Sequence, residues 1–302
     1  MKIHDIPKKT SILVITSPKG IRNIIQKLKA QNIKVTPARL SEMTVLLAED
    51  KTEVLVNKKP LSNYDFVWIQ SAGTTKDIAY LLSLYLDHLK IPHSNPETEI
   101  TKIVDLFNLS LHHLPIPKTY YCSKKNLLQN LPDIAQLLGY PFLIKSTVSW
   151  GGNDIHLITK ASDFFAIVPD LPEHKKYTLQ KFIPNTFDYR IIVGNGAVLS
   201  GEKRFRTKDS FRNNACRGAT EVFLEIDEIP KKVKELAVKV AAVCDLSWAG
   251  VDIITNEVTG EILVLEVNRR PGLTKGSSET KAAFTYLKSI QENLMKMKGD
   301  LL

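Results

Sequence analysis

The sequence is poor in cysteine and short of acidic residues. It has 3 cysteines among 302 residues, Cys122, Cys216 and Cys244. They are too few and too widely spaced for a disulfide framework or a zinc cluster, so we expect a reducing compartment. Glycine and proline are also modest, at 14 and 15 residues, which excludes a collagen-like chain, and 43% hydrophobic residues argue against disorder.

No long hydrophobic run is present. The most apolar stretch, residues 78–89, is interrupted by polar residues and is shorter than the about 18 apolar residues that a membrane span requires. Residues 11–16 are apolar but too short for the core of a secretory signal. The sequence therefore predicts a cytoplasmic protein with no membrane partner.

The acid deficit leaves a net charge of +9, from 41 Lys and Arg against 32 Asp and Glu. Such an excess favours anionic partners but says nothing about the fold. The lysine-rich segments are scattered and lack interleaved aromatic residues, which is typical of solvated surfaces. We therefore expect an anionic small-molecule or peptide substrate and no specific nucleic-acid partner, and we leave a homo-oligomer open.

Strand and helix patterns alternate in the first ninety-odd residues. Residues 11–16 and 64–70 are short apolar runs, and residues 21–31 and 78–90 have helical periodicity. Strands separated by helices predict a parallel sheet. The sequence thus predicts an α/β domain over residues 1–96.

The remaining chain mixes helices with strand pairs. A helix after residue 97 must end before Pro115 and Pro117. Hairpin signals follow at residues 194–196 and between residues 249–255 and 261–268. This pattern predicts an α+β body, which we divide into residues 97–183 and 184–302.

Oxygen ligands gather near the C-terminus. Asp252 lies in one apolar strand, and Glu266 and Asn268 lie two residues apart in the next, so they share a face. If the strands form a hairpin, three oxygen donors converge, as a magnesium site requires. The alternative is that these charges lie on a solvated sheet face.

A second group of residues is basic. It comprises Lys102, Lys145, Arg190, Arg212 and Arg217. Lys145 ends an apolar strand just before a glycine-containing loop, where a lysine and backbone N–H groups can bind a phosphate. Taken singly, each of these residues is more typical of a solvated surface.

In order along the chain, these motifs resemble one family. Lys102, GYPFLIK at 139–145, LQKFI at 179–183, DYRIIV at 188–193 and LEVNRRPGL at 265–273 match the ATP-grasp carboxylate–amine ligases, and most closely the RimK-type glutamate ligases. The resemblance covers the whole chain and is strongest from residue 102 to residue 273. It implies an ATP-grasp fold with an N-terminal parallel-sheet pre-ATP-grasp domain.

The resemblance also implies roles for single residues. It gives the nucleotide site as Lys102, Lys145, Gln180, Lys181, Phe182, Ile183, Asp188, Arg212, Asn213 and Asn214. It gives Asp252, Glu266 and Asn268 as the metal ligands, with Mg²⁺ as the metal and Mn²⁺ as the alternative. It gives Arg217, near the transferred phosphoryl group, as a catalytic residue. We expect Arg190 of the basic group to be the second catalytic residue.

Three positions depart from the family pattern. The loop at residues 149–154 has fewer glycines than expected, and Lys181 stands where related ligases usually have an acidic residue. Arg269 and Arg270 occupy positions where small residues are common. They are expected either to hold an anionic substrate through bidentate contacts or to form a surface turn before Pro271.

The predicted function is ATP- and Mg²⁺-dependent ligation of a carboxylate to an amine through an acyl phosphate. A RimK-like addition of glutamate or another amino acid to a peptide, protein or small acceptor is the favoured form. One alternative is a ligase that crosslinks side chains of a ribosomal peptide precursor. A second is a nucleotide-binding module without turnover.

Overall fold

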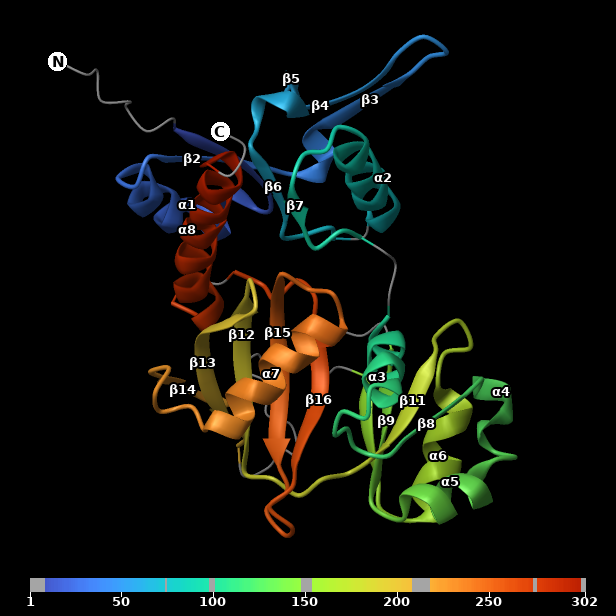
Figure 1. The fold of residues 1–302 in the computed structure, drawn as a ribbon. Helices are drawn as coiled ribbons and strands as arrows, with labels where there is room; N and C mark the ends of the chain where they lie inside the picture. Colours follow the sequence, from blue (N-terminus) through green and yellow to red (C-terminus); the bar gives the residue numbers. More distant parts are fainter. Residues whose placement is uncertain are drawn as a thin grey trace, which may run out of the picture.

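In the computed structural model, the N-terminal strands form a parallel sheet of four strands (Figure 1). The structure describes residues 9–73, 75–97, 101–147, 154–207, 218–273 and 276–299. The strands of this sheet, in spatial order, are β2 (Ile33–Ala38), β1 (Thr10–Ile15), β6 (Phe66–Ile69) and β7 (His93–Ser94). The sheet confirms the predicted N-terminal α/β arrangement.

Helices α1 (Pro18–Lys29) and α2 (Lys76–His88) connect strands of this sheet. β1 is buried along most of its length, as a strand covered on both faces must be. A small antiparallel sheet of β3 (Met43–Leu47), β4 (Thr52–Val56) and β5 (Lys59–Pro60) projects from the same body (Figure 1). The sequence patterns did not predict this second sheet.

A central antiparallel sheet follows. Its strands, in spatial order, are β10 (Ile155–Ile158), β9 (Phe142–Ser146), β11 (Tyr177–Lys181) and β8 (Thr119–Cys122). The helices beside it are α4 (Lys124–Leu127), α5 (Leu131–Leu138) and α6 (Ala161–Ile167). The buried apolar cluster beneath them draws its residues from this segment alone, from Leu127 to Leu179.

The third sheet has five antiparallel strands. In spatial order they are β14 (Thr220–Leu224), β13 (Ala197–Phe205), β12 (Phe187–Gly194), β15 (Trp248–Thr255) and β16 (Ile262–Asn268). Asn195 and Gly196 join β12 to β13 with positive φ values of 48° and 75°, the geometry of a two-residue hairpin turn. The predicted hairpins at 194–196 and at β15–β16 are both confirmed.

Helices α3 (Lys102–Leu111) and α7 (Lys231–Val243) cover one face of this third sheet. Ile191 and Val251 point to that face and are fully buried against the helices. Since side chains alternate along a strand, Arg190 and Asp252 point to the opposite face. That opposite face carries the candidate site.

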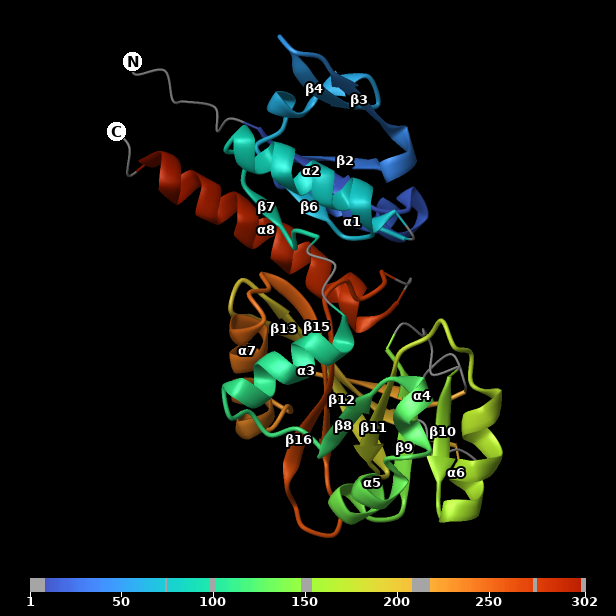
Figure 2. The ribbon, with the colours of Figure 1, turned by 90° about the vertical axis from the view of Figure 1, so that its right-hand side faces the viewer.

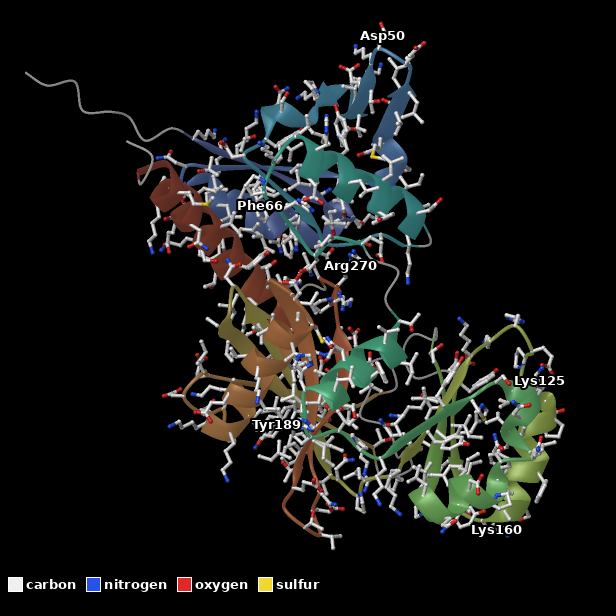
Figure 3. The ribbon with its side chains drawn as sticks, turned by 45° about the vertical axis from the view of Figure 1, so that its right-hand side comes forward. Asp50, Phe66, Lys125, Lys160, Tyr189 and Arg270 are labelled. Atoms are coloured by element: carbon white, nitrogen blue, oxygen red, sulfur yellow. The ribbon has the colours of Figure 1, made fainter. Side chains whose placement is uncertain are left out.

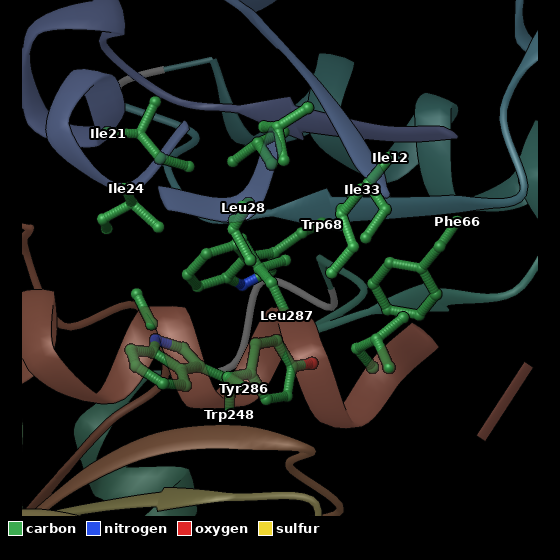
Figure 4. Close-up of a cluster of buried hydrophobic side chains, with 14 of the residues drawn as sticks. Ile12, Ile21, Ile24, Leu28, Ile33, Phe66, Trp68, Trp248, Tyr286 and Leu287 are labelled. Atoms are coloured by element: carbon green, nitrogen blue, oxygen red, sulfur yellow. The ribbon is translucent and has the colours of Figure 1, made fainter. Parts of the chain in front are cut away.

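The C-terminal helix α8 (Ser278–Gly299) lies along α1 (Figures 1 and 2). Trp68 of β6, Trp248 of β15 and Tyr286 of α8 pack together with ring centroids 5.1 to 5.2 Å apart (Figure 4). This cluster joins the N-terminal sheet to the third sheet in one hydrophobic core.

The helices complicate the predicted domain limits. α3, from the segment 97–183, packs on β16 and α7, and α8, from the segment 184–302, packs on α1. The boundaries at residues 96 and 183 therefore stay a prediction. None of the described helices is long and apolar enough to cross a membrane.

Candidate active site

Ionisable residues form a row across the face of the third sheet that lies opposite α3 and α7. The strand register places Glu202 opposite Arg190, Arg190 opposite Asp252, and Asp252 opposite Glu266. Directly opposite residues on neighbouring strands share a face and lie within contact distance. The register therefore brings two of the predicted metal ligands and the predicted catalytic Arg190 together.

Asp252 is the most strongly held carboxylate of the row. Arg190 binds it in a bidentate pair, with both N···O distances at 2.9 Å, and Arg204 Nη2 lies 3.1 Å from its Oδ2. Burial alone would raise the pKa of this carboxyl, but the two arginines hold the pKa well below its usual range. Asp252 is therefore ionised, which is the form that binds a divalent cation.

Glu266 and Asn268 complete the predicted ligand set. Glu266 Oε1 lies 2.8 Å from Lys102 Nζ at the start of α3. The Asn268 side chain donates a hydrogen bond to Asp252 Oδ2 at 3.4 Å. Two carboxylates and an amide, supplied by two adjacent strands, are the hard oxygen donors that Mg²⁺ prefers, so these residues fit the metal that the sequence predicts.

Lys145 reaches the same site from the central sheet. Its Nζ donates a hydrogen bond of 2.5 Å to Gln180 Oε1. Burial lowers the pKa of Lys145 to about 8, while the nearby carboxylates Glu266 and Asp252 oppose the shift. Lys145 and Lys102 thus bring two positive charges from separate elements to the metal-ligand residues, as binding of an anionic phosphate chain requires.

The predicted hinge strand runs from Gln180 to Ile183. The backbone N–H of Lys181 donates to Lys118 and that of Phe182 to Pro141, while the Ile183 carbonyl accepts from Asn185. The strand is thereby fixed between its neighbours. Its contact with a nucleotide base stays a prediction.

Asp188, the predicted ribose contact, is buried and bound by Arg204. The two N···O distances are 2.7 and 2.8 Å. Burial raises the pKa of Asp188 to about 6, although Arg204 opposes the shift. The Asp188 carboxylate thus has an internal partner, and its role toward ribose stays a prediction.

Arg204 is a site residue that the sequence reasoning missed. A regular hairpin around Asn195 and Gly196 would pair Asp188 with Lys203. A bulge between Ile192 and Val193 shifts the register by one residue and places Arg204 opposite Asp188. The sequence pattern does not predict that bulge, and so it could not place Arg204 in the site.

Two other features bear on the predictions. Arg212, Asn213, Asn214 and Arg217 lie outside the described residues, as does most of the loop at 149–154.

Arg269 and Arg270, expected to hold an anionic substrate or to form a surface turn, pair with Asp105 and Glu97 of the protein instead. These internal pairs correct both expectations.

Comparison with known proteins agrees with this geometry. Residues 102–290 match the RimK-like ATP-grasp domain family. Human N-acetylaspartylglutamate synthase A is 23% identical over 263 residues, which cover 83% of this chain and 66% of that protein. The chain therefore spans about two thirds of the length of that relative.

Two further comparisons concern an enzyme and a solved structure. The alpha-aminoadipate–LysW ligase LysX of Saccharolobus solfataricus is 29% identical over 209 residues, covering 64% of this chain and 71% of LysX. The structure of the ATP-grasp ligase PsnB with a minimal precursor superposes with a TM-score of 0.70 and 20% identity, covering 93% of this chain and 99% of PsnB. A second PsnB structure contains Mg and ADP.

The fold and the family match define an ATP-grasp protein with an N-terminal parallel sheet. The chain belongs to the RimK-like ATP-grasp family, a family of ATP-dependent carboxylate–amine ligases. The predicted family, fold class and enzyme class are confirmed.

Proposed function

We propose that this protein uses ATP and Mg²⁺ to join the carboxylate of one substrate to the amine of another. The observation that carries the proposal is the meeting of Asp252 and Glu266 with Lys102 and Lys145, which come from different elements. Carboxylates for a metal and lysines for phosphates are the parts that phosphoryl transfer needs. This constellation requires no nucleophilic side chain.

The metal site consists of Asp252, Glu266 and Asn268. A magnesium ion held there would neutralise charge on the phosphate oxygens and help to align them. Arg190 keeps Asp252 ionised and oriented through its bidentate pair. Lys102 and Lys145 bind the phosphate chain, and Arg217 stabilises the transferred phosphoryl group.

The reaction has two steps. A carboxylate oxygen of the first substrate attacks the terminal phosphorus of ATP, so that ADP leaves and an acyl phosphate forms. The amine nitrogen of the second substrate then attacks the acyl carbon, and inorganic phosphate leaves with the carboxylate oxygen while the amine loses a proton. The products are an amide, ADP and phosphate.

The substrates are an amino acid and a peptide, protein or small acceptor. Addition of an amino acid is favoured because the sequence relatives include N-acetylaspartylglutamate synthase A and a ligase named for alpha-aminoadipate and LysW. The first of these names favours glutamate as the amino acid. Crosslinking of a peptide precursor is the second candidate. It is favoured by the similarity to the ligase PsnB, whose structure holds a precursor, over 93% of this chain, and to a macrocyclase bound to a precursor peptide, over 93% of this chain.

The test begins with the purified protein, ATP, Mg²⁺, single amino acids and a cell extract as the source of acceptors. Acceptor-dependent ADP formation is expected, together with a mass increment in one acceptor. A gain of one amino-acid residue supports glutamate-type addition, while a loss of water from a peptide supports crosslinking. ATP binding without ADP formation under any condition would support a nucleotide-binding module and contradict the proposal.

A further inference from the structure

Two consecutive arginines follow the metal-ligand strand. Arg269 and Arg270 come directly after Asn268, the last residue of β16. Each forms an ion pair with a buried carboxylate, Arg269 with Asp105 and Arg270 with Glu97. Because protein carboxylates take up both guanidinium groups, substrate binding does not explain them.

Arg270 connects the strand to the N-terminal sheet. Its Nε donates to the carbonyl of Ile69 at 3.2 Å, its Nη2 donates to the carbonyl of Asn95 at 2.9 Å, and its Nη1 pairs with Glu97. Ile69 ends β6, and Asn95 follows β7. Figure 3 shows Arg270 at the junction between the N-terminal sheet and the third sheet. One planar guanidinium thus binds three groups, one at the end of β6 and two just after β7.

Asn95 makes the reciprocal connection. It is 2% exposed, and its φ of 53° lies in the left-handed region that asparagine tolerates. Its Nδ2 donates to the carbonyls of Trp248 at 2.7 Å and Arg269 at 2.5 Å, and its Oδ1 accepts from the Trp248 N–H at 3.2 Å.

These contacts fall at the ends of the two metal-ligand strands. Trp248 begins β15, which carries Asp252, and Arg269 directly follows β16, which carries Glu266 and Asn268. A single side-chain amide therefore joins the two strand ends. The backbone carbonyl of Asn95 in turn accepts a hydrogen bond from Arg270.

We propose that Asn95 and Arg270 are positioning residues for the metal ligands. The strand ladder pairs β15 with β16, and these two residues hold the ends of that pair against the N-terminal sheet. Metal affinity then depends on two side chains that touch neither the metal nor its ligands. This inference rests on the proposed function. Groups that hydrogen-bond a metal ligand directly contribute about 10- to 100-fold to metal affinity, and Asn95 and Arg270, which act through the backbone of the strand ends, should contribute about 10-fold.

The test substitutes Asn95→Asp. This change keeps the size of the side chain but replaces the donor with a carboxylate oxygen that faces two carbonyl oxygens. We expect Mn²⁺ binding in the presence of saturating ADP, measured by electron paramagnetic resonance, to weaken about 10-fold. The affinity for ADP without metal should stay at the wild-type value.

Gln291→Glu is the matched control. The Gln291 amide, which is also buried, donates to the carbonyl of Gln31 at 3.2 Å and links α8 to the N-terminal body. The change is again amide to acid against a carbonyl, but it lies away from β15 and β16. Gln291→Glu should lower the melting temperature and leave Mn²⁺ binding unchanged.

Equal Mn²⁺ affinity in Asn95→Asp and Gln291→Glu would overturn the inference. If Asn95→Asp fails to fold, Arg270→Lys decides in the same assay. Lysine retains the charge beside Glu97 but lacks the planar donor fork that reaches Ile69 and Asn95 together. Wild-type protein that binds no Mn²⁺ with ADP would overturn the proposed function and the inference with it. Wild-type protein that binds Mn²⁺, together with an unchanged affinity in Asn95→Asp (or in Arg270→Lys where that variant decides), would overturn the inference alone.

Discussion

At the scale of single residues, the site consists of carboxylates and arginines that pair on one sheet face. Arg190 lies between Glu202 and Asp252 in the strand register and also reaches Glu279 of α8 at 3.4 Å. Arg204 bridges Asp188 and Asp252. Each arginine thus pairs with two carboxylates, which compensates the buried negative charge and keeps Asp252 ionised.

Lys145 gives a prediction for the pH dependence of nucleotide binding. Its pKa of about 8 means that the ammonium is charged below this pH and loses its charge above it. The affinity for ADP should therefore fall as the pH rises through about 8. In Lys145→Arg the group stays charged, so calorimetric titrations on both sides of that pH should give the same affinity. An equal pH dependence in this variant would contradict the assignment.

Glu202 gives a prediction for stability. Burial raises the pKa of its carboxyl from 4.5 to about 7, and Glu279 adds to the shift. Between these two values only the unfolded chain releases the proton, so the free energy of unfolding should decrease as the pH rises through this window. Asp188, whose pKa is raised to about 6, contributes a decrease of its own. Urea unfolding of Glu202→Gln should therefore show a smaller decrease than the wild type, whereas the exposed control Glu257→Gln should keep the full decrease. A decrease of wild-type size in Glu202→Gln would refute the prediction.

At the scale of elements, α3 is held on the third sheet by a buried ion pair. Asp105 in its first turn pairs with Arg269 at 2.6 Å, and Asn108 donates to the carbonyl of Val243 in α7 at 2.8 Å. Lys102 starts the same helix. The pair with Arg269 therefore also sets where the phosphate-binding lysine lies.

Removing one partner of this pair should be costly. Arg269→Met leaves the Asp105 carboxylate buried without its partner, and we expect a loss of about 3 to 5 kcal/mol in the free energy of unfolding. Adding Asp105→Leu should recover most of this loss, because no charge then stays buried. Urea unfolding of both variants tests this, and a double variant as unstable as Arg269→Met would disagree with the assignment.

The elements also show how far the sequence alone can predict the site. Periodicity and turn residues predicted the β15–β16 hairpin and so the meeting of Asp252 with Glu266. They could not predict Arg204, whose position depends on a bulge, or the internal partners of Arg269 and Arg270. Those partners lie 164 and 173 residues away along the chain, and only the packed fold brings them together.

At the scale of the whole molecule, the N-terminal and third sheets share one core, while the central sheet has its own. Trp68, Trp248 and Tyr286 belong to the shared cluster, and Phe164 belongs to the central one. The packing of α8 on α1 was not predictable from the amphipathic pattern of either helix. Such a pattern indicates a buried face but not its partner.

This division predicts how the molecule unfolds. Trp68→Ala should cost about 3 to 5 kcal/mol and raise amide hydrogen exchange in β1, β6, β15 and α8 together. Phe164→Ala, the matched control, should raise exchange only in the central sheet and its helices. Faster exchange confined to the N-terminal sheet in Trp68→Ala would show that the two bodies unfold separately.

The most direct test of the central claim is ADP formation by the wild-type protein and by Asp252→Asn with ATP, Mg²⁺, glutamate and an acceptor extract. We predict acceptor-dependent ADP formation that Asp252→Asn abolishes, with the circular dichroism spectrum of the folded protein retained. ADP formation at the wild-type rate in Asp252→Asn, or none in the wild type despite ATP binding, would contradict the account.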